Sequence, residues 1–185
     1  YIGICGGTFF PSHKVYKNMT YYDGEHYISS FQNPLHSANL LDKNIRNTIL
    51  GAYRTKNTDQ NISLSIESLF NDTNHIEYAI SKVELDSLVN NYEKTGFYGP
   101  ISWYANLDEN IKLSEQWGNN KLNQNILFMF GEKDMAVKLT ENMRQRLNKV
   151  ADVVKIKEIS EAGHWLPYTH KERVLDEIYS LSKGS

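Results

Sequence analysis

Apolar residues form a short uninterrupted run at positions 126–130, in the last third of the chain. The run ends abruptly in Gly131-Glu132-Lys133-Asp134, which is typical of a buried parallel strand followed by a turn. A helical pattern follows over 140–150, and a second strand-like run over 153–159 stops shortly before Gly163-His164. This order of segments predicts a βαβ unit, in which the two strands lie parallel in one sheet.

The first residues of the chain carry a similar strand pattern. Tyr1-Ile2-Gly3-Ile4-Cys5 is apolar and β-branched, and Gly6-Gly7 closes it, so it predicts another parallel strand of the same sheet. We interpret Cys5 as a buried strand residue. A competing interpretation makes it a nucleophile on a small-x-nucleophile-x-small elbow, but such an elbow needs a helix after it. Pro11 disfavours helical geometry in the residue before it.

The middle of the chain has the 3.6-residue period of helices. Leu40, Leu41, Ile45 and Ile49 predict a helix over 35–53. A polar, turn-rich stretch follows over 54–61 and predicts an exposed loop. After it come a weaker apolar segment at 62–70 and another polar loop.

Two more helices are predicted between residues 81 and 118. Ser81 and Glu84 have the spacing of a capping box, and Gly96 stands where that helix would stop. Gly99-Pro100 then restarts the pattern, with proline in a first-turn position, and the last helix ends near Trp117-Gly118.

The periodicity also suggests a division of the chain. Residues 170–183 predict a terminal helix that packs on the sheet. We therefore expect a core strand and lid entry at 1–33, a helical lid at 34–118 and a second part of the core at 119–185. The lid is expected over the edge of the sheet where the strands end.

Composition narrows the classes of function. A chain of 185 residues with 40% apolar residues can bury one core. Its net charge is only −2, and its Lys and Arg residues are scattered, which excludes a surface built for nucleic acid or an anionic membrane. No apolar run has the length of a transmembrane helix. The single Cys5 excludes an intrachain disulfide and favours a reducing compartment such as the cytoplasm.

An acid and a histidine end the two predicted strands of the βαβ unit. Because the carboxyl ends of parallel strands open at the same edge of a sheet, Asp134 and His164 are expected to meet there. An aspartate that orients a histidine base is two thirds of a catalytic triad. The pair therefore requires a nucleophile from elsewhere.

Four motifs together resemble epoxide hydrolases of the α/β-hydrolase fold. They are Tyr27 ahead of Phe31-Gln32-Asn33-Pro34, then Gly96-Phe97-Tyr98-Gly99-Pro100-Ile101-Ser102-Trp103-Tyr104, then Gly131-Glu132-Lys133-Asp134, and last Gly163-His164-Trp165, in the order found in that family. There are two departures. Leu35 replaces the family's glycine after Pro34, and the family's nucleophilic aspartate and His-Gly-x-Pro oxyanion loop have no counterpart. By the resemblance, the chain looks like the C-terminal part of such an enzyme.

The resemblance implies a partial α/β-hydrolase fold and a set of roles. Tyr27 and Tyr104 would activate the oxygen of an apolar epoxide, while Asp134 and His164 would activate water to release a vicinal diol. The aromatic residues expected to line the substrate pocket are Phe31, Trp103 and Trp165. No metal or organic cofactor is implied. The expected partners are the epoxide, water and either a missing N-terminal half of the fold or another chain that covers the exposed sheet.

Three alternatives stay open at this point. The chain could be a non-catalytic remnant or interaction subunit, because the nucleophile is absent. A haloalkane dehalogenase of the same fold would need amide or indole N–H donors for a halide, which paired tyrosines do not supply. A hydrolase that uses Cys5 would need the elbow discussed above.

Overall fold

The computed structural model divides the chain into two compact units. One, the sheet unit, comprises Tyr1–Phe10 and Trp117–Ser185; the other, the helical unit, is Pro11–Gln116. The residues that the structure describes are 2–5, 27–55, 65–66, 77–117, 120–134, 137, 139–152 and 154–183. Most of the apolar segment at 62–70 and most of the polar loop at 54–61 lie outside them. The domain boundaries expected at 33 and 118 stay a prediction.

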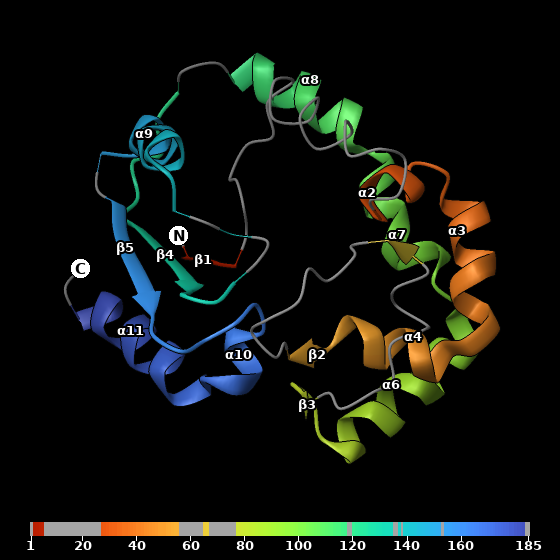
Figure 1. Ribbon diagram of the computed structural model, residues 1–185. Coiled ribbons are helices and arrows are strands. Elements are labelled where there is room, and N and C mark those ends of the chain that lie inside the picture. The colour runs from red at the N-terminus through yellow and green to blue at the C-terminus, as the bar shows by residue number, and fades with distance from the viewer. Residues whose placement is uncertain are drawn as a thin grey trace. The chain divides into compact units, whose positions relative to one another are not determined.

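Three parallel strands form the centre of the sheet unit (Figure 1). They are β1 (Ile2–Ile4), β4 (Ile126–Gly131) and β5 (Val154–Ile159), in the order β1-β4-β5. Ile2 pairs with Leu127, and Ile126 pairs with Val154. All three strands were predicted, including the parallel pairing of the first. The middle strand is buried along its whole length, which explains why its sequence is apolar without alternation.

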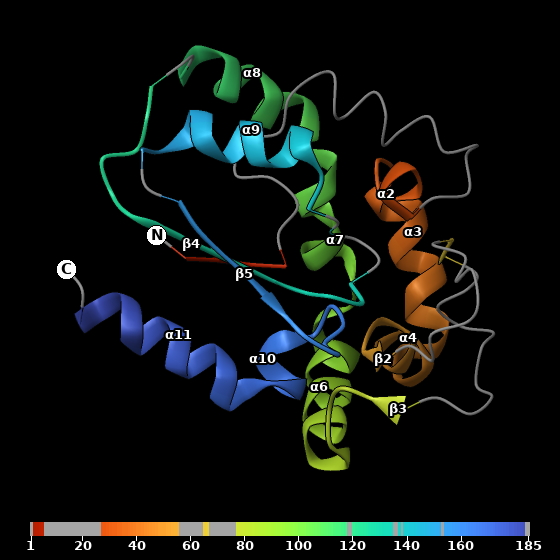
Figure 2. The same cartoon turned by 60° about the vertical axis from the view of Figure 1, so that its left-hand side comes forward.

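One face of β4 packs against the terminal helix. Leu127 and Met129 form an apolar cluster with Val174 of α11 (Lys171–Lys183), and Ile178 packs against it. Figure 2 shows α11 along one face of the sheet and α9 (Glu141–Val150) along the other. The predicted terminal helix is therefore confirmed.

The opposite face of β4 packs against the crossover helix. Phe128 and Phe130 stack with their ring centroids 5.8 Å apart, and Leu147 of α9 is buried with them. Thr140 caps this helix, because its side chain accepts a hydrogen bond from the backbone N–H of Met143 at 3.2 Å. Successive side chains of β4 thus point to opposite faces of the sheet and pack against α11 on one face and α9 on the other.

The first part of the helical unit contains three short helical segments. They are α3 (Pro34–Leu41), the 3₁₀ turn η1 (Asp42–Asn44) and α4 (Ile45–Ala52), preceded by α2 (Tyr27–Ser30). The prediction of one continuous helix over 35–53 was therefore wrong. Asn44 has an extended φ of −148°, and its side chain accepts a hydrogen bond from the N–H of Asn47, so a new helix begins there.

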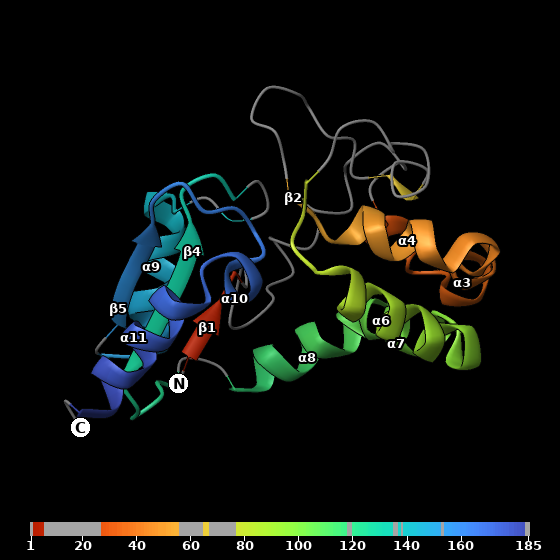
Figure 3. The same cartoon turned by 90° about the horizontal axis from the view of Figure 1, so that it is seen from below.

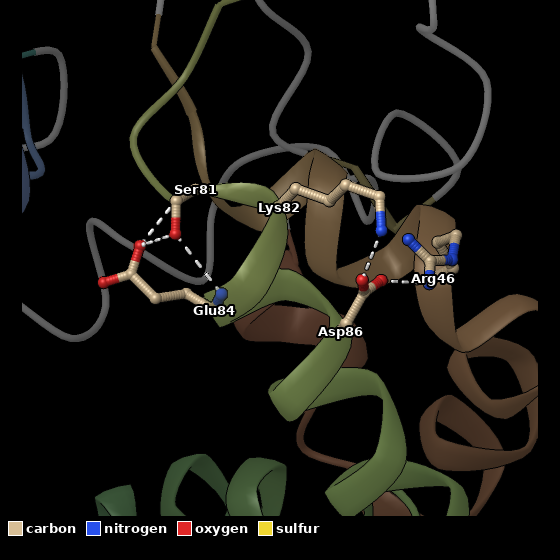
Figure 4. A network of polar contacts seen from close by, with 5 residues as sticks. All are labelled: Arg46, Ser81, Lys82, Glu84 and Asp86. Carbon is tan, nitrogen blue, oxygen red and sulfur yellow. Dashed lines mark hydrogen bonds and ion pairs between the residues drawn. The ribbon is translucent and has the colours of Figure 1, made fainter.

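Helix α6 (Lys82–Thr95) begins and ends where the sequence predicted. The carboxylate of Glu84 accepts the N–H of Ser81 at 2.7 Å, and the Ser81 hydroxyl accepts the N–H of Glu84 at 3.3 Å (Figure 4). The helix stops at Gly96, whose φ of +63° suits a residue without a Cβ. The capping box is confirmed.

An ion-pair network joins α6 to α4. Asp86 Oδ1 lies 2.6 Å from a guanidinium nitrogen of Arg46, and Asp86 Oδ2 lies 2.6 Å from Lys82 Nζ. Figure 4 shows each cation against one oxygen of the carboxylate. The pKa of Asp86 is lowered by these hydrogen bonds. Figure 3 shows α4 beside α6, and α3 contacts α7 (Tyr98–Ala105). The apolar core between these helices consists of buried residues from each of them, namely Ala38, Leu41, Ile49, Leu85, Val89, Phe97 and Ile101.

The last predicted helix of this unit is interrupted. It comprises α7 and α8 (Leu107–Trp117), with Asn106 between them. The N–H of Asn106 bonds to the carbonyl of Trp103, and its side chain bonds to the carbonyl of Ser102, which turns the backbone out of the helix. The predicted end at Trp117 is confirmed.

Several short elements, including α2, were not predicted from the sequence patterns. Strands β2 (Arg54–Thr55) and β3 (Glu77–Tyr78) form an antiparallel pair, so the prediction of a loop was wrong at 54–55. Helix α10 (Leu166–Thr169) follows β5. Elements this short hold too few residues for a period to be visible. No helix in the described part of the chain is long and apolar enough to cross a membrane.

Candidate active site

A tight turn after β4 carries Asp134. The N–H of Asp134 bonds to the carbonyl of Gly131, and the N–H of Lys133 bonds to the carbonyl of Ala162. A Cβ placed on Gly131 would lie 2.2 Å from the Ala162 carbonyl oxygen and 2.4 Å from that of Gly163. Glycine is therefore required at 131, because only its bare backbone lets the ends of β4 and β5 approach so closely.

We predict that Gly131→Ala will pull these two strand ends apart. The added methyl group meets backbone oxygens that cannot rotate away, so the free energy of unfolding should fall by about 1–3 kcal/mol or more. Gly163→Ala is the matched control, since a Cβ there meets nothing within 4 Å. Urea unfolding of both variants checks this; equal stability would contradict the close approach at 131.

Asp134 and His164 are in contact, as the sequence predicted they could be. His164 Nδ1 lies 3.0 Å from Oδ2 and 3.2 Å from Oδ1 of Asp134, while the N–H of Val137 donates to Oδ1 at 3.2 Å. The Asp134 side chain is fully buried, and that of His164 is 43% exposed. An ionised carboxylate can only accept, so this contact favours the tautomer with the proton on Nδ1. Nε2 is then left as a base.

A second set of contacts fixes the loop before His164. Glu132 accepts hydrogen bonds from the N–H of Glu161 at 3.0 Å and from the Ser160 hydroxyl at 2.9 Å. These bonds lower the pKa of Glu132. Lys133 also pairs with Glu161. Glu161 has a φ of +61°, so these contacts hold a backbone turn that a non-glycine residue rarely adopts.

Cys5 lies close to both Asp134 and His164. It follows β1 with a φ of +50°, and its N–H donates to the carbonyl of Met129 at 2.9 Å. The ligand atoms of Cys5, Asp134 and His164 all lie within 4.8 Å of one another. Burial and the nearby Asp134 carboxylate raise the pKa of the thiol to about 12.

The sequence interpretation of Cys5 as a buried strand residue was wrong in two respects. Cys5 is only partly buried, and it lies just beyond the end of β1. Its position at the end of a predicted parallel strand was the signal that would have placed it beside Asp134 and His164.

In the helical unit, Tyr27, Phe31 and Tyr104 form an aromatic cluster. Their ring centroids lie 5.4 Å, 5.7 Å and 5.2 Å apart for the pairs 27–31, 27–104 and 31–104. Burial raises the pKa of both phenols. The neighbouring Tyr104 raises the pKa of Tyr27 further, while Tyr27 opposes the rise at Tyr104.

Gln32 holds this cluster together, although sequence reasoning gave it no role. Its side-chain amide donates to the backbone carbonyl of Tyr104 at 2.9 Å and to that of Ile28 at 3.1 Å. These two bonds tie α2 to α7 and so bring Tyr27 to Tyr104. The signal was the place of Gln32 in the Phe-Gln-x-Pro motif, directly after the buried Phe31.

The two tryptophans predicted for the substrate pocket have different surroundings. Trp103 is 71% exposed on α7. Trp165 stands edge-on to the His164 ring, at a centroid distance of 5.4 Å, and also contacts Tyr168. The role of Trp103, Trp165 and Phe31 as pocket residues stays a prediction.

Solved structures of known proteins settle the fold. Potato (Solanum tuberosum) epoxide hydrolase I superimposes with a TM-score of 0.72 and 20% identity, over 100% of this chain and 61% of that one. Epoxide hydrolase A from Mycobacterium thermoresistibile superimposes with a TM-score of 0.76 and 20% identity, over 99% and 60%. The chain has a partial α/β-hydrolase fold. The predicted fold class is thereby confirmed.

Curated proteins support the resemblance on which that prediction was based. This chain is 32% identical to epoxide hydrolase A of Mycobacterium tuberculosis (strain ATCC 25618 / H37Rv) over 109 residues, which are 57% of this chain and 32% of that protein. It is also 32% identical to bifunctional epoxide hydrolase 2 of Mus musculus over 82 residues, 44% of this chain and 14% of that protein. The matches thus span about a third or less of these relatives. No family model matches the chain.

Proposed function

We propose that this α/β-hydrolase chain supplies the tyrosine pair and the histidine–acid pair of an epoxide hydrolase. The reaction would convert an apolar epoxide to a vicinal diol, through an ester on an aspartate that is not among these residues. The observation that carries the proposal is the contact between Tyr27 and Tyr104, whose ring centroids lie 5.7 Å apart. It distinguishes an epoxide hydrolase from other hydrolases of this fold, which have no use for two adjoining phenols.

The tyrosines suit the first chemical step. As a carboxylate attacks a ring carbon, the epoxide oxygen becomes an alkoxide, so donors aimed at that oxygen stabilise charge that develops only in the transition state. Each phenol can donate one hydrogen bond. Burial keeps both hydroxyls protonated near neutral pH, because it raises the pKa of each. Either can then pass its proton to the alkoxide.

The histidine suits the second step. With its Nδ1–H directed at Asp134, His164 can accept a proton from water at Nε2. The resulting hydroxide attacks the ester carbonyl and releases the diol. Asp134 stabilises the imidazolium that forms, which is the role of a buried acid in a triad.

A hydrolase that uses Cys5 as nucleophile is less well supported. A reactive cysteine needs a lowered pKa, because the thiolate is the attacking species. Here the thiol lies near a buried carboxylate, and its pKa is raised to about 12. Unchanged activity after Cys5→Ala would dispose of this alternative.

The proposal is tested on the natural polypeptide that contains this chain. Mass spectrometry should find an aspartate on a nucleophile elbow ahead of Tyr1, and the purified protein should hydrolyse an aryl-substituted epoxide to its diol. A natural polypeptide that begins at Tyr1, has no companion fragment and leaves the epoxide intact would instead support a non-catalytic remnant.

A further inference from the structure

Three kinds of metal-ligand atom meet at the ends of the strands in the sheet unit. A thiol sulfur from Cys5, a carboxylate oxygen from Asp134 and an imidazole nitrogen from His164 lie within 4.8 Å of one another. They follow β1, β4 and β5 respectively, so the parallel sheet itself brings them together. The proposed hydrolysis uses the acid and the histidine but gives Cys5 no task.

The spacing is close to that of a tetrahedral ion. Zinc binds sulfur at about 2.3 Å, and nitrogen and oxygen at about 2.0–2.2 Å, which sets its ligand atoms roughly 3.3–3.6 Å apart. Nδ1 of His164 lies 3.0 Å from Asp134 Oδ2, and no pair among the three ligand atoms is farther apart than 4.8 Å. Side-chain rotations of small amplitude are therefore enough to enclose an ion.

The surroundings also favour a cation at this place. Asp134 carries a fully buried side chain, whose carboxylate is held in place by hydrogen bonds from Val137 and His164, so it is a fixed oxygen ligand beside the thiol. Cys5 has a φ of +50°, a strained conformation that persists only where the surrounding structure holds it. His164 is 43% exposed, which gives an ion and a fourth ligand, water, access from the solvent.

We propose that Cys5, Asp134 and His164 bind a borderline divalent cation of the zinc type. Thiolate and imidazole ligands select such ions, whereas Mg²⁺ and Ca²⁺ need sets of oxygen ligands. When the ion binds, the thiol releases its proton to solvent and the sulfur becomes a ligand. Because the ion occupies His164 and Asp134, it prevents them from activating water. This inhibition rests on the proposed function, but the binding itself does not.

Co²⁺ is the probe for the test, since its bond to a thiolate gives a charge-transfer absorption. Titration of the reduced chain should show one equivalent of Co²⁺ with that band, and Zn²⁺ should displace it. Cys5→Ser should abolish the band and weaken Zn²⁺ binding by roughly tenfold or more. His164→Gln should weaken it to a similar degree, whereas His36→Gln, a change of an exposed histidine on α3, should not.

A second measurement needs no variant. Cys5 is the only cysteine, so stoichiometric Zn²⁺ should slow its alkylation by iodoacetamide at least tenfold, and chelation should restore the rate. Absence of the charge-transfer band, binding that survives Cys5→Ser or His164→Gln unchanged, or alkylation indifferent to Zn²⁺ would each overturn the site. None of these measurements uses an epoxide, so they test the metal site independently of the proposed function. If the chain binds the ion but the natural polypeptide does not hydrolyse epoxides, only the proposed function is refuted.

Discussion

Replacing Tyr104 by phenylalanine in the complete natural polypeptide is expected to slow formation of the covalent ester by roughly 10²-fold or more. The ring stays in its cluster with Tyr27 and Phe31, so the change removes only the hydroxyl. Charge builds on the epoxide oxygen only in the first step. Hydrolysis of the ester should therefore change far less, and single-turnover kinetics separate the two rates.

Helix α7 offers a matched control for this experiment. Tyr98 lies on the same helix but is 53% exposed, so Tyr98→Phe should leave both steps unchanged. Tyr27→Phe should resemble Tyr104→Phe, because the two rings are in contact and both hydroxyls belong to the proposed donor pair. Equal losses in ester formation and ester hydrolysis after Tyr104→Phe would count against a role at the epoxide oxygen.

Replacing His164 by glutamine should have the opposite effect. Without a general base, hydrolysis of the ester is expected to slow by about 10²–10⁴-fold, while ester formation continues, so the intermediate accumulates. Glutamine can still donate a hydrogen bond to Asp134, which keeps that buried carboxylate satisfied. Mass spectrometry of the protein after brief exposure to an epoxide measures the added mass of the ester.

The corresponding control is His36→Gln, which alters an exposed histidine of the helical unit. This variant should hydrolyse the epoxide at the wild-type rate and should accumulate no covalent ester. If His164→Gln forms no detectable covalent adduct while its fold is intact, the two-step scheme is wrong and water must attack the epoxide directly.

The proposed hydrolysis and the proposed metal binding both require the side chains of Asp134 and His164. His164 can act as a base only when its Nε2 is free and Asp134 holds Nδ1–H, whereas an ion beside Cys5 takes both groups as ligands. Trace metal would therefore lower the measured hydrolysis rate. Kinetic assays of the tyrosine and histidine variants should accordingly contain a chelator.

Sequence patterns were sufficient wherever a structure depends on neighbouring residues. The uninterrupted apolar run predicted the central strand β4, because a strand covered on both faces has no polar side to show. The spacing of Ser81 and Glu84 predicted the start of α6, because both capping bonds join residues three positions apart. The patterns missed the breaks at Asn44 and Asn106, where a single side chain competes with the helix for backbone hydrogen bonds.

By itself the sequence determined the parallel strands and the main helices, because periodicity and caps are local properties of the chain. The motif resemblance singled out Tyr27, Tyr104, Asp134 and His164, whose catalytic roles stay a prediction. Only the tertiary structure decided that Gln32 ties α2 to α7 and that Cys5 lies within reach of Asp134 and His164. The bond from Gln32 to Tyr104 joins residues 72 positions apart, and Cys5 is more than 100 positions from Asp134 and His164 in the chain. These contacts depend on where strands and helices end in space, which no local pattern records.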